Sequence, residues 1–156
     1  MLNFPNDREL VVNRLIDAPP EKVYRCWTEP DLLKQWFAPK PFTVVAAKLD
    51  VRPGGASEIV MQSPDGLRFP NVGVFLEAIP NERLVFTDAF TSGWAPKDGP
   101  PFMVAIVALK EENGKTAYEA RVRHWTPQAR QEHERMGFHS GWGQCADQLV
   151  ALARTL

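Results

Sequence analysis

Apolar and polar residues alternate along most of the chain before residue 124, in short runs that turn signals separate. A period of two residues is typical of β-strands with one buried face. Pro-Gly, Asp-Gly, Pro-Asn and Asn-Gly pairs between the runs indicate tight turns. Because these connections are short, we expect antiparallel hairpins rather than parallel strands joined by crossover helices. The pattern predicts seven strands, over residues 9–16, 42–51, 56–63, 69–79, 83–90, 102–111 and 116–124.

Three segments have a helical pattern instead. Two short helices are predicted directly after the first strand, over residues 18–27 and 29–37, and each has proline near its start. A long helix closes the chain, with Thr126 as N-cap and Pro127 as first helical residue, and it extends to about Ala153. The order of elements predicts an α+β fold in which the long helix packs on the sheet.

The long helix has one apolar stripe when it is laid out at 100° per residue. The stripe, within about 60° of Trp142, consists of Phe138, Cys145, Ala146, Leu149, Ala153 and Leu156. Toward the N-terminus the same stripe carries Gln131 and Arg135, with His139 at its edge. A helix would show this change if one half closed a core and the other half bordered a hollow or solvent; a simple overhang of its first turns is the alternative.

Three glycines interrupt this helix, Gly137, Gly141 and Gly143, although each is about 1 kcal/mol less favourable than alanine in a helix. Gly137 and Gly141 fall on a flank away from the stripe, so we do not expect them simply to form a pocket wall. Either the helix bends between Gly137 and Gly143, which we favour, or another segment approaches this flank closely. An unbroken helix that tolerates its glycines is a third reading.

Composition narrows the classes of partner. The 156 residues are 44% hydrophobic, the size and content of one domain, 1–156. A net charge of −1 gives no field that would attract nucleic acid or a membrane surface. Cys26 and Cys145 do not form a CxxC pattern, so we expect free thiols and a cytoplasmic location. The sequence shows neither a signal peptide nor a membrane-spanning run, and a small neutral partner fits best.

Several segments together carry a family resemblance: VVNRLIDAPPEKVYRCWTEPDLLKQWFAP, LDVRPGG, GVFLEAIPNERLVFTDAF and MGFHSGWGQCADQLVAL. The chain resembles the family named for the activator of the heat-shock protein 90 ATPase, in the START-like or Bet-v-type (SRPBCC) superfamily. The resemblance implies a helix-grip fold: a curled antiparallel sheet of six to seven strands around a long C-terminal helix, with two short helices after the first strand. It also implies a cavity between helix and sheet.

Members of this superfamily bind hydrophobic metabolites, sequester toxic small molecules or catalyse polyketide cyclisation, so the fold alone does not select a function. The eukaryotic activator also has a separate chaperone-binding domain, for which 156 residues leave no room, and we expect no direct chaperone activation. We favour a protein that binds an apolar, aromatic or polyketide-like ligand. A cyclase or hydrolase that uses the same cavity, and a chaperone-associated module of a stress response, are the alternatives.

No catalytic or metal motif is recognisable. No serine has a GxSxG context, and His133 and His139 are six residues apart, whereas HExxH places its histidines four apart. We therefore expect no metal and no cofactor, and we assign no catalytic residue. A convergent pair such as His124 and Asp88 would favour the enzyme alternative.

The candidate ligand-binding residues come from the predicted inner faces of sheet and helix. His124 or Arg135 would orient a polar end of the ligand, and a purely structural histidine is the alternative for His124. Asp88, if buried, would need Arg135 or His124 as partner, and an exposed strand end is the alternative. Trp94 lies in a Gly/Pro-rich loop, where it would serve as a lid over the cavity or as a contact in a homodimer. The twelve candidates are Trp36, Met61, Phe75, Phe86, Asp88, Trp94, Met103, Tyr118, His124, Arg135, Phe138 and Trp142.

Overall fold

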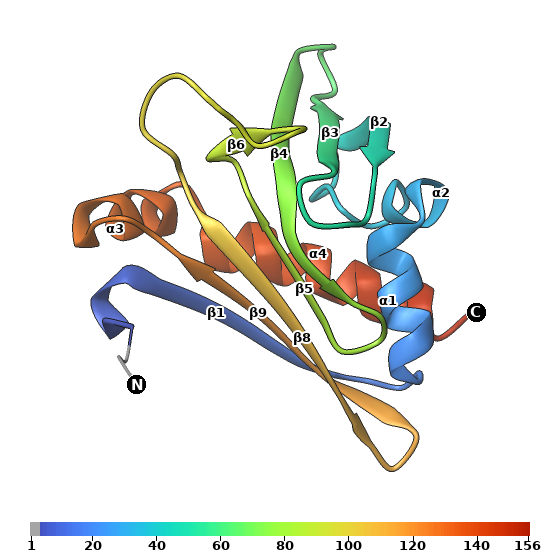
Figure 1. Cartoon of the computed structure of the whole chain (residues 1–156). Coiled ribbons are helices and arrows are strands. Elements are labelled where there is room, and N and C mark those ends of the chain that lie inside the picture. The colour runs from blue at the N-terminus through green and yellow to red at the C-terminus, as the bar shows by residue number, and fades with distance from the viewer. Residues whose placement is uncertain (1–3) are drawn as a thin grey trace.

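A seven-stranded antiparallel sheet wraps around the C-terminal helix in the computed structural model, which describes residues 4–156 (Figure 1). The strands follow the order β1-β9-β8-β5-β4-β3-β2. Bulges shift the register between Val44 and Ala46 and between Phe75 and Glu77, and bulges increase the local twist of a sheet. The sheet strands are β1 (Glu9–Ile16), β2 (Thr43–Leu49), β3 (Ala56–Gln62), β4 (Arg68–Ile79), β5 (Arg83–Thr87), β8 (Val104–Glu112) and β9 (Lys115–Arg123). The predicted α+β helix-grip fold with seven antiparallel strands is confirmed.

Strand β9 shows why the alternation was informative. Thr116, Tyr118, Ala120 and Val122 are buried, and His124 directly after the strand is buried too. The charged residues point to the other face, where Arg121 and Arg123 both bind the carboxylate of Glu9 on the neighbouring strand β1. The predicted assignment of the two faces of this strand is therefore correct.

The predicted strand over residues 83–90 ends earlier than expected, at Thr87. The chain turns at Asp88. A separate hairpin follows, whose two strands, β6 (Phe90–Thr91) and β7 (Ala95–Pro96), have two residues each. Trp94, at the tip of this hairpin, lies against the turn before β3. A Cβ on Gly54 would approach the Trp94 indole to 2.8 Å, and the φ of Gly54 is +79°. Glycine at position 54 is thus needed for both the backbone conformation and this contact.

Helices α1 (Pro20–Thr28) and α2 (Pro30–Leu33) cover the end of the sheet near the C-terminus of α4 (Figure 1). Each begins at a proline, where the missing N–H group would have no intrahelical partner. The amide of Gln148 on α4 donates to the carbonyl oxygens of Trp36 (2.8 Å) and Ala38 (2.9 Å). These bonds fix the segment after α2 against the C-terminal half of α4. A single-turn 3-10 helix, η1 (Asn6–Arg8), precedes β1.

The predicted long helix is two helices. Helix α3 (Pro127–Arg135) begins at Thr126, whose hydroxyl oxygen accepts from the Ala129 N–H at 3.0 Å, as predicted. It stops at Met136–Gly137, and α4 (Phe138–Ala153) starts in a new direction after Gly137, whose φ is +97°. The expectation of a bend is right in kind, but the interruption is a full break at Gly137 rather than a bend spread to Gly143. Of the helices described over residues 4–156, none is long and apolar enough to cross a membrane.

Candidate functional site

A pocket of about 680 Å³ lies between the sheet and the N-terminal half of α4 and is partly open to solvent. Apolar side chains make up most of its wall, with contributions from β1, β3, β4, β5, β9, α1 and the segment after α2. The largest of these side chains are Trp27, Trp36, Phe37, Phe42, Ile59, Met61, Phe69, Phe86, Phe102, Met103, Tyr118, Met136, Phe138 and Trp142.

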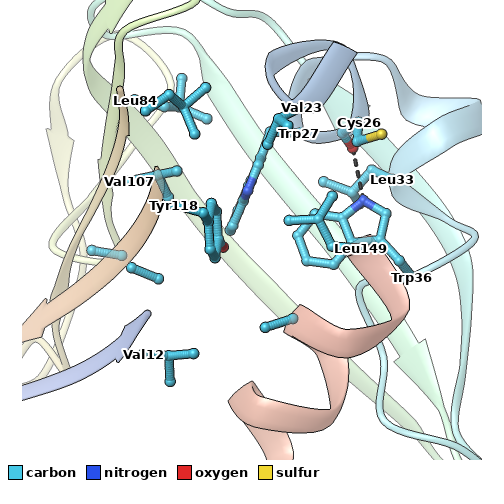
Figure 2. Close-up of a cluster of buried hydrophobic side chains, with 14 of the residues drawn as sticks. Val12, Val23, Cys26, Trp27, Leu33, Trp36, Leu84, Val107, Tyr118 and Leu149 are labelled. Atoms are coloured by element: carbon cyan, nitrogen blue, oxygen red, sulfur yellow. Dashed lines mark hydrogen bonds between the residues drawn. The ribbon is translucent and has the colours of Figure 1, made fainter. Parts of the chain in front are cut away.

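The inner end of the pocket is closed by aromatic rings. The rings of Trp27 and Trp36 meet edge to face with centroids 4.8 Å apart, and the Trp27 ring lies 5.6 Å from that of Phe86. The Trp36 indole N–H donates to the Cys26 carbonyl oxygen at 2.9 Å, the dashed line in Figure 2. Figure 2 also shows the Tyr118 ring beside the Trp27 indole. Edge-to-face aromatic contacts favour fixed ring orientations, so this end of the pocket is rigid.

Burial raises the pKa of two ionisable groups at this end. Desolvation raises the pKa of the Tyr118 hydroxyl, although the Trp27 indole N–H opposes the shift. That indole nitrogen is buried and has no hydrogen-bond partner within the described residues, and desolvation is the larger of the two causes. Desolvation also raises the pKa of the Cys145 thiol to about 12, and its Sγ lies 3.4 Å from the Phe37 carbonyl oxygen. Neither group supplies an anion at neutral pH.

Two polar side chains of the wall form hydrogen bonds with the protein backbone. Both oxygens of the Asp88 carboxylate accept from the backbone N–H of Phe102, at 2.9 and 2.8 Å, and one also accepts from that of Met103 at 3.0 Å. The hydroxyl of Thr87 donates to the Met103 carbonyl oxygen at 2.8 Å. Asp88 therefore holds the segment before β8 in place. Asp88 is half-buried, and it is paired with neither Arg135 nor His124, the partners expected for a buried carboxylate at this position.

Two histidines lie in contact where α3 meets the end of β9. Nε2 of His124 is 2.9 Å from Nδ1 of His133, and Nδ1 of His124 is 3.0 Å from the Arg8 carbonyl oxygen. Both rings are buried, and the ring of His133 forms part of the pocket wall. Desolvation lowers the pKa of both, with the His124 neighbour as a further cause for His133, whose pKa falls to about 4. The pair is thus neutral at physiological pH.

The mouth of the pocket lies beside the break between α3 and α4. Met136 is 68% exposed and Phe69 on β4 is 46% exposed, and both border the opening. Gly137 and Gly141 also line the pocket, and a Cβ at either position would meet no atom within 4 Å. The expectation that these glycines lie away from the pocket wall is therefore wrong. The close approach instead occurs at Gly143, where a Cβ would lie 3.4 Å from Nη2 of Arg14.

The structure brings together eight of the twelve predicted residues. Those in the pocket wall are Trp36, Met61, Phe86, Asp88, Met103, Tyr118, Phe138 and Trp142. Phe75 is buried on β4 behind Phe86, with ring centroids 6.5 Å apart, and His124 is buried behind His133.

The other two predicted residues face away from the pocket. The Arg135 side chain is 72% exposed, with one guanidinium nitrogen 3.6 Å from Glu132 Oε2, so it does not reach a ligand inside. Trp94 packs on Phe90 and the Gly54 turn and is not part of the wall, so it does not form the expected lid. Its role in a homodimer stays a prediction.

The polar residue of the pocket wall that the sequence analysis did not place there is His133. On one continuous helix, at 100° per residue, His133 would lie about 180° from Trp142 and Arg135 about 20° from it. The break at Gly137 changes this phase, so that His133 faces the sheet and Arg135 faces solvent. A signal was present: glycine after an arginine in the last helical turn is typical of a helix C-terminus.

No cluster of three or more potential metal ligands occurs among residues 4–156.

Comparison with known proteins then identifies the family. No curated protein matches the chain. A crystal structure of a protein from Nitrosomonas europaea is 40% identical, with 97% of each chain covered and a TM-score of 0.93. A protein from Chromobacterium violaceum is 25% identical over 95% of this chain and 97% of its own, with a TM-score of 0.77.

A solution structure of a protein from Staphylococcus epidermidis, 24% identical, shares the fold with a TM-score of 0.80 and covers 99% of this chain and 94% of its own. The family model described as "Activator of Hsp90 ATPase homolog 1-like protein" matches residues 17–154. Proteins of this family and of its superfamily generally bind hydrophobic ligands. The chain belongs to the family of Activator of Hsp90 ATPase homolog 1-like proteins.

Proposed function

We propose that this protein binds a small, largely apolar ligand, aromatic or polyketide-like, in the pocket between the sheet and α4. The observation that carries the proposal is the pocket itself: about 680 Å³ with a predominantly apolar and aromatic wall. Pockets for drug-sized ligands have volumes of about 300 to 1,000 Å³ and walls of this kind. The family membership agrees, because hydrophobic ligands are what its members generally bind.

The shape of the wall favours a flat ligand. Phe138 and Trp142 stack with ring centroids 5.3 Å apart on one side, and Trp27 and Phe86 lie in contact at the inner end. Aromatic faces and edges offer specific contacts to another aromatic ring, beyond the burial of its area. A sugar or a nucleotide would leave many polar groups unpaired against this wall.

The pocket also bears on the two alternatives. An interaction module would use a filled core and a large exposed apolar patch, whereas side chains leave the gap beneath the N-terminal half of α4 unfilled. The convergent pair His124 and Asp88, which would favour a cyclase or hydrolase, does not form, since Asp88 binds backbone N–H groups of Phe102 and Met103. Ligand binding is therefore the function that the geometry supports best.

Tryptophan fluorescence tests the proposal, because Trp27, Trp36 and Trp142 line the pocket whereas Trp94 and Trp125 are exposed elsewhere. The variant with Trp94→Phe and Trp125→Phe removes the signal that does not come from the pocket. We expect anthraquinone and related planar compounds to quench the remaining fluorescence with a Kd below about 100 μM, and glucose and AMP to have no effect. Absence of saturable quenching by the whole aromatic panel would contradict the proposal.

A matched pair of leucine variants locates the binding. Gly141→Leu adds a side chain at the pocket, where a Cβ meets no atom, whereas Ala151→Leu adds the same side chain on the exposed face of the same helix. We expect Gly141→Leu to weaken binding by about tenfold or more, equivalent to about 1.4 kcal/mol, and Ala151→Leu to leave it unchanged. Equal effects of the two variants would place the bound compound elsewhere.

A further inference from the structure

Hydrogen bonding determines which ring nitrogen carries the proton in each of the two histidines, His124 and His133. A carbonyl oxygen only accepts hydrogen bonds, so the Arg8 carbonyl, 3.0 Å from Nδ1 of His124, requires the proton of His124 to reside on Nδ1. In the neutral ring Nε2 then carries a lone pair. This lone pair, 2.9 Å from Nδ1 of His133, requires a proton on that nitrogen. Neutral His133 is left with a lone pair on its own Nε2.

Both rings are neutral in the folded protein. His124 is 1% exposed and His133 is 7% exposed, and desolvation is the largest cause of the lowered pKa of each. The hydrogen bond to the Arg8 carbonyl oxygen opposes the lowering of the His124 pKa, and the positive charge of Arg130 on α3 adds to it. No carboxylate bonds to either ring within residues 4–156.

The lone pair on His133 Nε2 belongs to the pocket. The His133 ring is part of the pocket wall and is surrounded by the rings of Phe102, Phe138 and Trp142, at centroid distances of 4.6, 5.1 and 6.4 Å. Within the described residues, nothing donates a hydrogen bond to Nε2. Among the described residues, two side-chain polar atoms are both inaccessible and without a hydrogen-bond partner, Trp27 Nε1 and Gln148 Oε1. Nε2 of His133 also has no partner but is not one of these atoms, so it is accessible from the pocket.

We propose that Nε2 of His133 is the acceptor that recognises a hydroxyl or N–H group on an otherwise apolar aromatic ligand. The inference rests on the proposed function and specifies its ligand class: neutral phenols and N–H heteroaromatics are selected over plain hydrocarbons and over carboxylates. A carboxylate ligand would meet a lone pair at Nε2, and the wall also contains the carboxylate of Asp88. The one ammonium group in the wall, that of Lys97, already donates to the Val72 carbonyl oxygen at 2.9 Å. His124 acts as a positioning residue, because it fixes which nitrogen of His133 is bare.

Calorimetry near neutral pH with naphthalene, 2-naphthol and 2-naphthoate tests the selection. We expect 2-naphthol to bind about tenfold more tightly than naphthalene, the usual net effect of one buried hydrogen bond, and more tightly than 2-naphthoate. Equal affinities for naphthalene and 2-naphthol, or tightest binding of 2-naphthoate, would overturn this inference and leave the proposed function standing. Failure of all three to bind would overturn both.

Two substitutions distinguish the role of Nδ1 of His133 from that of Nε2. In His133→Asn the side-chain amide can still donate to His124 from near the Nδ1 position, but nothing remains at Nε2. We expect the ratio of the affinities for 2-naphthol and naphthalene to fall to about one. His133→Gln places an amide oxygen near the Nε2 position and should restore part of the advantage. An advantage that persists in His133→Asn would overturn the inference.

A measurement on the unaltered protein avoids dependence on how the variants fold. Nitrogen-15 NMR of the imidazoles reports which ring nitrogens carry protons. We expect protonated Nδ1 and bare Nε2 in both His124 and His133, and a shift of the His133 Nε2 signal when 2-naphthol is added. A proton on Nε2 of His133 in the free protein, or an unchanged signal at saturating 2-naphthol, would overturn the inference.

Discussion

The two halves of α4 meet the rest of the protein differently. Around its C-terminal half, Leu149 is completely buried among side chains of α1, α2 and the segment after them, including Val23, Leu33 and Trp36 (Figure 2). Around its N-terminal half, Trp142 and Cys145 are only partly buried and border the pocket. The difference follows from the short helices, which bring bulky side chains to one end of the sheet. The same helix thus closes a core at one end and lines a site at the other.

The largest expected effect concerns the filled end. Leu149→Ala removes a fully buried side chain from a region with no space for it to relax into, so we expect a loss of about 3 to 4 kcal/mol in the free energy of unfolding. Urea denaturation measures this loss. A loss below about 1 kcal/mol would show that this end is loosely packed and would remove the contrast between the two halves.

The second effect is the dependence of stability on pH. His133 has a pKa of about 4 in the folded protein because of burial and of His124, against 6.5 for the free side chain. Between these values the unfolded chain binds a proton that the folded protein excludes. The stabilisation is therefore complete above about pH 6.5 and is lost as pH falls toward 4, by about 1 to 3 kcal/mol.

The comparison with His133→Asn isolates this effect from that of the acidic residues. We expect the free energy of unfolding of this variant to fall less steeply over the same pH interval, as urea denaturation at a series of pH values would show. Parallel profiles for the two proteins would mean that His133 is not held neutral by the fold. The pocket beside the N-terminal half of α4 would then have no buried neutral histidine to distinguish it from the core around the C-terminal half.

The third effect concerns Trp142, which a continuous apolar stripe would place in the core. Because Trp142 is partly buried and borders the pocket, we expect Trp142→Ala to destabilise the protein by about 1 to 2 kcal/mol, less than Leu149→Ala. Ligand affinity should fall at the same time, since the stacked surface on Phe138 is lost. A destabilisation as large as that of Leu149→Ala would indicate that the pocket is filled in solution.

The smallest effects come from two glycines four residues apart. Gly137→Ala forces a side chain into a left-handed conformation and should destabilise the protein by about 1 kcal/mol. Gly141 is inside α4 with open space at its Cβ, so Gly141→Ala should stabilise by up to about 1 kcal/mol. Thermal unfolding of the two variants should therefore shift in opposite directions. Shifts of the same sign would contradict the break between α3 and α4.

Local patterns in the sequence predicted most of the fold. The alternation in β9, the prolines that start α1 and α2, and the Thr126 cap each act over a few residues, and all were confirmed. The sheet order pairs β9 with β1, whose partner residues are 100 or more positions apart, and no local pattern predicts such a pairing.

The apolar part of the site could be predicted in the same way, because Met61 and Tyr118 lie on inner strand faces and Met103 directly precedes β8. The polar part could not. One residue in the left-handed conformation, Gly137, changes the helical phase, and this exchanges the places of Arg135 and His133. The pairing of His133 with His124 depends on this phase and on the carbonyl oxygen of Arg8, which no side-chain pattern reveals.

The most direct test of ligand binding at the pocket end uses methionine methyl groups. Met61, Met103 and Met136 all line the pocket, and the fourth methionine, Met1, lies outside the described residues. In protein labelled with carbon-13 at these methyls, we predict nuclear Overhauser effects between 2-naphthol ring protons and the Met61 and Met103 methyls, with a shift of the Met136 signal at the mouth. Unchanged Met61 and Met103 signals at saturating 2-naphthol would contradict the account.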